Sequence, residues 1–197
     1  MQELVYCVAT AELTDPQEVV IPLQRDEYDR LLEIGEFRQR DEVEEDPSWR
    51  QIIPYAVVTR RDQILLVERL RAGRESRLHD QLSIGLGGHI NPSNHPNARD
   101  IFEGGLIREL QEELYIGAYC STVMGLIHSN EGSVNLVHTG LLYWIRTFED
   151  VRVRETQKLD GKLVRWDEVG KVREQLEGWS RLAFDFLSKK NDPDFNY

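Results

Sequence analysis

The chain has 197 residues, of which 40% are hydrophobic and 30% are charged, a composition typical of a folded globular protein rather than a disordered one. Its formal net charge is −11, and residues 1–49 carry most of that excess, with four arginines against fourteen acidic side chains. Nucleic-acid binding requires a basic surface, and a membrane span requires a run of about eighteen apolar residues. The sequence has neither, so we expect no nucleic acid and no membrane among its partners.

Cys7 and Cys120 are the two cysteines of the sequence, too few for a disulfide framework. The first residues, Met-Gln-Glu-Leu-Val-Tyr, lack the basic and apolar regions of a secretory signal. Both features favour a reducing compartment, and we expect a cytoplasmic protein.

An acidic stretch with a proline, residues 41–48, marks the clearest boundary in the chain. Before it, residues 3–8 and 18–23 predict short strands, and residues 26–34 predict a helix. A segment this short buries little core alone. We therefore expect residues 1–48 to form an acidic N-terminal extension packed on the main body.

The main body, residues 49–190, is expected to open with a hairpin formed by residues 52–59 and 63–68. A short strand over residues 82–86 is followed by the glycine pair Gly87-Gly88. The next element is a helix over residues 98–115, with Asn97 as its predicted N-cap and Gly117 as its C-terminal stop.

Two strands, residues 118–127 and 134–147, are expected on either side of a turn at residues 130–133. A last strand over 163–166 and a closing helix over 172–187 follow, and residues 191–197 form a loose tail. Strands interrupted by single helices predict the α/β class, as an α/β/α sandwich with a mixed central sheet.

The candidate catalytic and metal-binding residues lie near the end of the helix predicted for residues 98–115. At about 100° per residue, Glu109, Glu112 and Glu113 lie on one face. Crowded carboxylates repel one another unless a cation or bulk water offsets the repulsion, and hard divalent cations prefer carboxylate oxygens. Arg108 is placed to pair with Glu112, four residues on. The alternative is an ordinary solvated face of a glutamate-rich helix.

Glycines near these acids favour a binding site over a plain surface. Gly104 and Gly105 lie inside the predicted helix, where each costs about 1 kcal/mol relative to alanine. Gly105 is one turn before Glu109, so we expect it to leave room for close approach to the carboxylates. Gly88 directly follows a strand, where a bare backbone can come close to a ligand.

The combination of Gly88 with Arg108-Glu109-Leu110, any residue, and Glu112-Glu113 resembles the signature of the Nudix hydrolases, over roughly residues 50–190. That signature reads Gly, five residues, Glu, seven residues, Arg-Glu-aliphatic-x-Glu-Glu-x-Gly-aliphatic. This sequence departs from it in three ways. Six extra residues separate Gly88 from Arg108, Asp100 replaces the first glutamate, and Tyr115 replaces the later glycine.

The resemblance implies a Nudix-like fold and divalent-metal-dependent hydrolysis of a diphosphate linkage in a nucleoside diphosphate joined to another moiety. It implies Mg²⁺ (or Mn²⁺) held by Glu109, Glu112 and Glu113, with the carbonyl of Gly87 or Gly88 able to complete the shell. Arg108, Glu112 and Glu113 are then expected to be catalytic. The general base is expected to be either a glutamate of this cluster or Glu131. The alternative interpretation of Glu131 is that it is an ordinary solvated residue in a turn.

Substrate contacts are expected upstream of the helix. His89 is placed either to touch a phosphate or to brace its loop, and Arg74 and Arg77 give their loop a positive character suited to a phosphate tail. The alternative is that Arg74 and Arg77 are solvated surface residues without a role in binding. We interpret His128 and His138 as structural residues. The expected partner is a small nucleotide or diphosphate, and we expect a homodimer.

Two other functions compete with hydrolysis. A catalytically inactive Nudix-like domain that binds or senses a nucleotide would not need three crowded acids. An isopentenyl-diphosphate isomerase would need a catalytic cysteine and a histidine-rich metal site, and neither Cys7 nor Cys120 lies in such a setting.

Overall fold

The computed structural model describes residues 3–13, 19–69, 82–93, 95–130, 132–154, 156–157 and 159–190. Arg74, Arg77, Glu131 and the tail 191–197, all named above, lie outside these ranges. None of the helices within them is long and apolar enough to cross a membrane.

The strands are β1 (Leu4–Ala9), β2 (Val19–Pro22), β3 (Glu36–Gln39), β4 (Trp49–Arg60), β5 (Gln63–Arg69), β6 (Leu82–Ser83), β7 (Gly85–Gly87), β8 (Leu114–Tyr115), β9 (Tyr119–His128), β10 (His138–Thr147), β11 (Arg152–Val153) and β12 (Leu159–Arg165). The α-helices are α1 (Arg25–Ile34), α2 (Arg40–Val43), α3 (Ile101–Glu113), α4 (Gly132–Asn135), α5 (Trp166–Lys171) and α6 (Gly178–Ser188). Within the described ranges, 3₁₀ turns cover Thr10–Glu12 and Arg173–Gln175.

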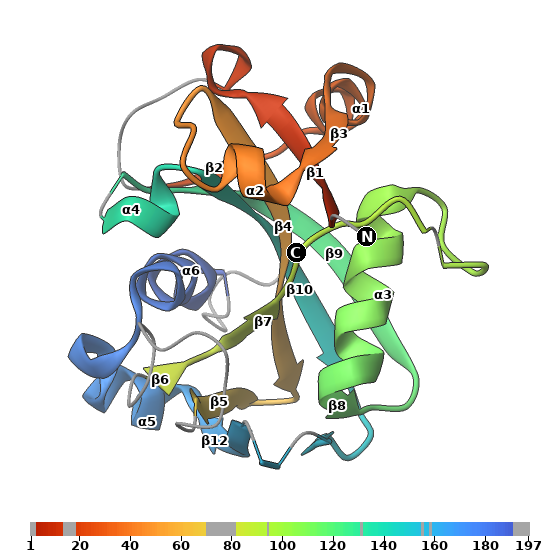
Figure 1. Ribbon diagram of the computed structural model, residues 1–197. Coiled ribbons are helices and arrows are strands. Elements are labelled where there is room, and N and C mark those ends of the chain that lie inside the picture. Colours follow the sequence, from red (N-terminus) through yellow and green to blue (C-terminus); the bar gives the residue numbers. More distant parts are fainter. Residues whose placement is uncertain are drawn as a thin grey trace. The chain divides into compact units, whose positions relative to one another are not determined.

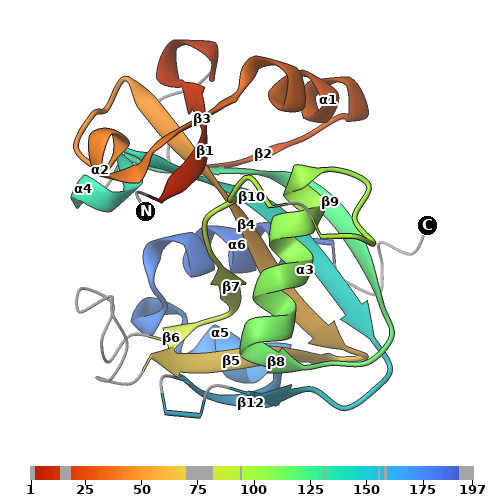
Figure 2. The same cartoon turned by 45° about the vertical axis from the view of Figure 1, so that its right-hand side comes forward.

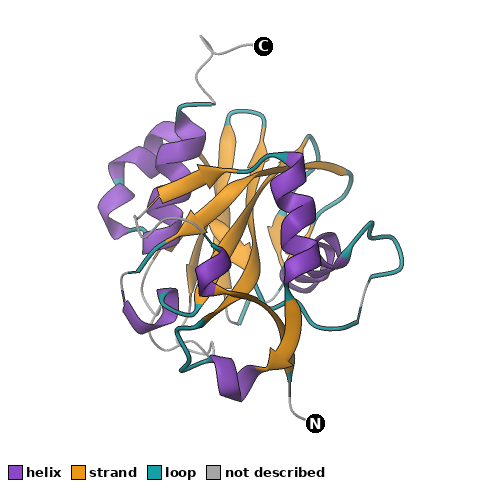
Figure 3. Ribbon diagram, turned by 90° about the horizontal axis from the view of Figure 1, so that it is seen from above, coloured by secondary structure: helices purple, strands orange, loops and turns teal. Residues whose placement is uncertain are grey.

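In the described part of the chain, ten strands form one large mixed sheet with the hydrogen-bonded order β12-β5-β4-β10-β9-β2, to which β1, β3, β6 and β7 are also paired. Strands β8 and β11 form a separate two-stranded sheet. Figure 3 distinguishes the helices from these strands by colour. The predicted α/β class with a mixed sheet is confirmed.

The chain divides into two compact units. The first comprises Met1–Tyr55, Gly87–Glu109 and Val123–Tyr143, and the second comprises Ala56–Leu86, Leu110–Thr122 and Trp144–Tyr197. The predicted boundary between residues 48 and 49 stays a prediction.

In the first unit, β1 pairs antiparallel with both β3 and β4, so that Cys7 lies opposite Glu36 on one side and Gln51 on the other. The red and orange elements of Figure 1 show this arrangement of β1 and β3 beside α1. The Tyr6 hydroxyl reaches the main-chain carbonyl of Leu31 at 3.1 Å. A Cβ on Gly35 would lie 2.4 Å from the Tyr6 ring, so this close approach requires glycine.

In the second unit, β5 pairs antiparallel with β12 along its length and with β6 at Val67 and Glu68 (Figure 2). The predicted hairpin is confirmed: β4 ends at Arg60, β5 starts at Gln63, and Arg61 in the turn has φ 54°. A side-chain hydrogen bond connects helix α6 to strand β6: Ser180 Oγ lies 3.0 Å from Ser83 Oγ.

The predicted start of the long helix was wrong by several residues. Helix α3 begins at Ile101, and its N-cap is Asp100 rather than Asn97. The Asp100 carboxylate accepts hydrogen bonds from the main-chain N–H groups of Phe102 at 3.0 Å and Glu103 at 2.9 Å. The first N–H groups of a helix have no acceptor within the helix, so a side chain must supply one. Asp100 does so here, and the helix therefore starts directly after Asp100.

The predicted end of that helix was also wrong. Helix α3 stops at Glu113, and the next two residues form β8, which pairs with β11. The main-chain carbonyl of Glu113 accepts a hydrogen bond from Arg154 N–H at 2.7 Å. Among the described glycines Gly132 alone has a positive φ, so Gly117 does not form a left-handed cap.

The strand predicted for residues 134–147 begins only at His138. The short helix α4 and a left-handed Gly132, with φ 78°, precede it. The physical reason is Arg50, 3% exposed, whose guanidinium donates to the main-chain carbonyls of Ser129, Asn135 and His138 and to Asn130 Oδ1. These bonds hold the connection in a compact loop.

The C-terminal region was predicted as one strand and one helix, and both boundaries differ. Strand β12 starts at Leu159, and the residues predicted as a single helix over 172–187 form a 3₁₀ turn and α6. The break falls at Glu177, whose carboxylate accepts hydrogen bonds from Trp179 N–H and Ser180 N–H, both at 2.9 Å, and so caps α6.

Candidate active site

Helix α3 is fixed at its first turn and packed closely along its buried side. Gly104 and Gly105 are buried. A Cβ on Gly105 would lie 3.0 Å from Ile90 and 3.2 Å from Pro54. The expectation that Gly105 leaves room for a ligand was therefore wrong: the missing side chain lets the helix pack against its neighbours.

Arg108 joins this helix to the loop that follows β7. Its guanidinium donates to the main-chain carbonyl of His89 and to Asn91 Oδ1, and it pairs with Glu109 Oε1 at 2.8 Å. The planar fork of arginine suits such a set of acceptors. Arg108 thus forms an ion pair with Glu109, and the pairing with Glu112 expected from the sequence spacing stays a prediction.

Gly88 lies directly against Glu109. A Cβ on Gly88 would fall 2.3 Å from Glu109 Oε1, closer than any side chain allows. The Glu109 side chain is 12% exposed. A side chain at position 88 would therefore displace the Glu109 carboxylate, and the Gly88 main chain lies beside a carboxylate that remains partly accessible.

Glu112 and Glu113 occupy the last turn of α3. Glu112 is exposed and Glu113 is half-buried. On an α-helix, residues three and four positions apart share a face, so both follow Glu109 along one side of α3. The structure brings together Gly88, Arg108 and Glu109 through direct contacts, and the helix itself aligns the other two glutamates.

A second cluster of ligand-type side chains was missed by sequence reasoning. Glu44, His89 and His138 each offer one ligand atom, and these atoms lie within 4.8 Å of one another. Burial, aided by the charge of Arg40, lowers the pKa of His89 to about 4, so its imidazole is neutral at pH 7. Burial opposes ionisation of Glu44, but the hydrogen bond from Arg40 and nearby positive charge outweigh it and lower its pKa.

No sequence signal pointed to this cluster because its members are more than forty residues apart and follow no spacing motif. His138 was interpreted as structural, and Glu44 belongs to an acidic stretch that predicted only a boundary. The phosphate contact expected of His89 stays a prediction.

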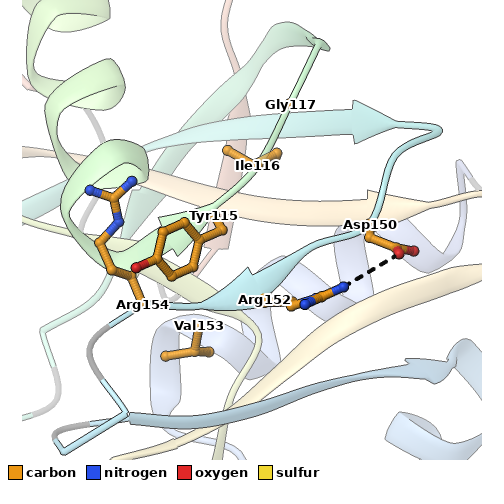
Figure 4. Close-up of a pocket in the computed structure, with 7 residues that line it drawn as sticks. All are labelled: Tyr115, Ile116, Gly117, Asp150, Arg152, Val153 and Arg154. Carbon is orange, nitrogen blue, oxygen red and sulfur yellow. Dashed lines mark ion pairs between the residues drawn. The ribbon is translucent and has the colours of Figure 1, made fainter.

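A cavity of about 620 Å³ lies in the second unit, immediately after α3 (Figure 4). The Arg154 guanidinium lies 4.5 Å from the centroid of the Tyr115 ring, and Tyr115 is 58% exposed. Tyr115, which stands where the Nudix signature has glycine, is accommodated because its ring lies at the surface against Arg154. The cavity is lined by Tyr115, Ile116, Gly117, Asp150, Arg152, Val153 and Arg154.

Comparison with known proteins supports the resemblance noted from the sequence. No family model matches the chain. Protein YmaB of Bacillus subtilis is 37% identical over 157 residues, which cover 76% of each protein. The solved structure of Tm1382, a candidate Nudix hydrolase, is 29% identical with a TM-score of 0.82 over 95% of this chain and 99% of that one.

Two more distant structures share the fold. DR0079 of Deinococcus radiodurans has a TM-score of 0.55 at 13% identity, over 84% of this chain and 96% of that one. A bifunctional NMN adenylyltransferase/ADP ribose pyrophosphatase of Francisella tularensis, in complex with AMP and a Mn ion, has a TM-score of 0.52 at 12% identity, over 71% and 41%.

The fold is that of a Nudix-type protein, and the similarity to Tm1382 over almost the whole chain supports the resemblance to the Nudix hydrolases. YmaB is a relative that matches the chain over three quarters of both proteins. The structural neighbours support a pyrophosphohydrolase function in general terms and do not favour a catalytically inactive binding domain.

Proposed function

We propose that this protein is a divalent-metal-dependent hydrolase that cleaves a diphosphate linkage in a nucleoside diphosphate joined to another moiety. One observation carries the proposal. Arg108 ties the loop after β7 to helix α3, and this places the bare main chain of Gly88 against the Glu109 carboxylate.

The residues present fit a hard divalent cation. Glu109, Glu112 and Glu113 supply carboxylate oxygens, and the lack of a Cβ at Gly88 leaves its carbonyl able to approach the same region. Mg²⁺ or Mn²⁺ is the proposed cofactor. When bound, such an ion would neutralise charge on a diphosphate and lower the pKa of a coordinated water.

The side chains of this chain have separate proposed roles. Arg108 is a positioning residue because its hydrogen bonds fix the loop and Glu109 rather than a reacting atom. Glu112 and Glu113 are proposed to act on the attacking water or the leaving phosphate. Glu131 remains the alternative general base, and Arg74 and Arg77 the proposed contacts to a phosphate tail.

The proposed substrate class agrees with the names of structural neighbours. The Francisella tularensis protein is an ADP ribose pyrophosphatase complexed with AMP and a Mn ion, although its 12% identity limits the likeness to the fold. A small nucleotide is thus the proposed partner, in a cytoplasmic protein that we propose to be homodimeric.

The test is a screen of nucleoside diphosphate derivatives, ADP-ribose first, with Mg²⁺, with Mn²⁺ and with a chelator. Released phosphorus products are quantified by ³¹P NMR or chromatography. We expect turnover of at least one derivative with either metal and none with the chelator. Tight nucleotide binding without cleavage under every metal condition would contradict the proposal and favour a sensor domain.

A further inference from the structure

Three side chains from separate segments of the first unit converge at a second cluster of ligand atoms. Glu44 follows α2, His89 follows β7, and His138 is the first residue of β10. The two imidazole rings lie 5.6 Å apart between centroids. We propose that Glu44, His89 and His138 form a second metal site, which binds one divalent transition-metal ion of the Zn²⁺ class.

His138 is oriented as metal-binding histidines usually are. Its Nδ1 lies 2.7 Å from the main-chain carbonyl of Val134. Because a carbonyl can only accept, Nδ1 carries the proton, and the lone pair of the neutral ring is on Nε2. A ring nitrogen bonded to a backbone carbonyl fixes the tautomer and the direction of the ligating nitrogen.

His89 presents a buried nitrogen that the described residues do not satisfy. Its Nε2 is buried and has no hydrogen-bond partner among them. Polar atoms buried in this way are costly in a folded protein unless they bind something. A metal ion shared with His138 and Glu44 would satisfy this atom, whereas the main-chain carbonyl of His89 is already used by Arg108.

Glu44 supplies the negative charge, and its surroundings hold it in place. Arg40 Nε lies 3.2 Å from Glu44 Oε2, and the same guanidinium pairs with Glu3 at 3.0 Å. Within this set of ion pairs the two carboxylates outnumber the one guanidinium. Ligating carboxylates are commonly hydrogen-bonded by such outer partners.

Geometry and ligand type favour Zn²⁺ over Mg²⁺. With metal–nitrogen bonds of about 2.0–2.1 Å, two tetrahedral ligand atoms lie roughly 3.4 Å apart. Side chains whose ligand atoms lie within 4.8 Å need only small rotations to reach that separation. Two imidazoles with one carboxylate suit a transition metal, whereas Mg²⁺ prefers oxygen ligands alone. Three protein ligands also leave a fourth position open.

The experiment uses the full chain and the metal alone. Co²⁺ titration, followed by visible absorption, reports imidazole coordination, and Zn²⁺ titration by calorimetry gives affinity and stoichiometry. The variants are Glu44→Gln and His89→Gln. The matched controls are Glu42→Gln, an exposed acid of helix α2 two residues before Glu44, and His95→Gln, a histidine outside the cluster. Glu112→Gln separates this site from the glutamate helix.

We expect one tightly bound equivalent of Zn²⁺ per chain, distinct from weaker binding at the glutamates of α3, and the affinity of this tight site should fall roughly tenfold or more in Glu44→Gln and His89→Gln. Glu42→Gln, His95→Gln and Glu112→Gln should bind within twofold of the unmodified protein. Zn²⁺ should also raise the thermal midpoint of the controls by clearly more than that of Glu44→Gln. Because Glu44 is half-buried, this variant decides the question if His89→Gln does not fold. Equal Zn²⁺ affinity in Glu44→Gln and Glu42→Gln, or no binding by the unmodified chain, would overturn the proposal.

Discussion

The carboxylate of Asp100 both caps helix α3 and accepts hydrogen bonds from the hydroxyl of Tyr28, which lies 3.0 Å from each of its oxygens. Tyr28 belongs to α1, so one acidic side chain anchors the start of the glutamate helix to the N-terminal segment of the same unit. The Tyr28 ring also meets Phe102 of α3 edge-on, with centroids 5.4 Å apart.

Asp100→Ala should therefore destabilise the protein by about 1–3 kcal/mol, since it removes an N-cap and leaves the buried Tyr28 hydroxyl with fewer partners. Asn97→Ala, at the exposed position that spacing predicted as the cap, should change stability by less than about 0.5 kcal/mol. Urea unfolding of both variants provides the comparison. Equal losses would mean that Asp100 does not anchor the helix.

The contact between Gly88 and Glu109 predicts a substitution that affects turnover. In Gly88→Ala the new Cβ must displace the Glu109 carboxylate, and a shift of about 1 Å at a catalytic group costs roughly 10²-fold in rate. Gly178→Ala is the control, because a Cβ there meets nothing within 4 Å. Steady-state kinetics on the substrate found in the screen would measure both, and full activity in Gly88→Ala would rule out a role for this contact.

Arg108 should act through position rather than charge alone. Arg108→Lys keeps the charge but loses the fork that reaches His89, Asn91 and Glu109, so we expect kcat to fall about tenfold or more. Arg99→Lys, at an exposed arginine paired with Glu103, should leave kcat within twofold. A change in KM alone for Arg108→Lys would point to direct substrate binding instead.

The Arg99–Glu103 pair at the start of α3 predicts a pH dependence of stability. The hydrogen bond from Arg99 is the main cause that lowers the pKa of Glu103 below its usual value of 4.5. A lowered folded-state pKa means that the stabilisation is complete above the unfolded pKa and is lost as pH falls through the folded one. The stability difference between the unmodified protein and Glu103→Gln should thus be about 0.5 kcal/mol at pH 7 and should shrink as the pH falls below the usual glutamate pKa and through the lowered one. A difference that grows on acidification would contradict this sign.

The sequence predicted the elements whose signals are local. The 52–59 and 63–68 hairpin and the glutamate face of α3 follow from alternation and helical periodicity, and both are near their expected places. Boundaries set by distant partners were not predictable. Asp100, which caps α3, is also hydrogen-bonded by Tyr28 from the distant helix α1. Residues 134–137 do not form part of β10 because Arg50 holds their main chain in a loop through a hydrogen bond to the Asn135 carbonyl.

The candidate site divides in the same way. Gly88, Arg108 and the three glutamates follow a spacing motif that the sequence displays, although their metal-binding role stays a prediction. The cluster of Glu44, His89 and His138 depends on three segments that only the tertiary structure brings together. The packing role of Gly105 likewise depends on Ile90 and Pro54, which no local pattern connects to it.

The central claim is tested most directly by the Mg²⁺-dependent kcat of Glu112→Gln measured beside Glu103→Gln, the same change on the same helix at an acid outside the proposed site. We predict a loss of at least about 10²-fold for Glu112→Gln with unchanged folding, as is typical when a key electrostatic group is removed, and less than a twofold change for Glu103→Gln. Equal activity in the two variants would contradict the proposal that the glutamate face of α3 performs the chemistry.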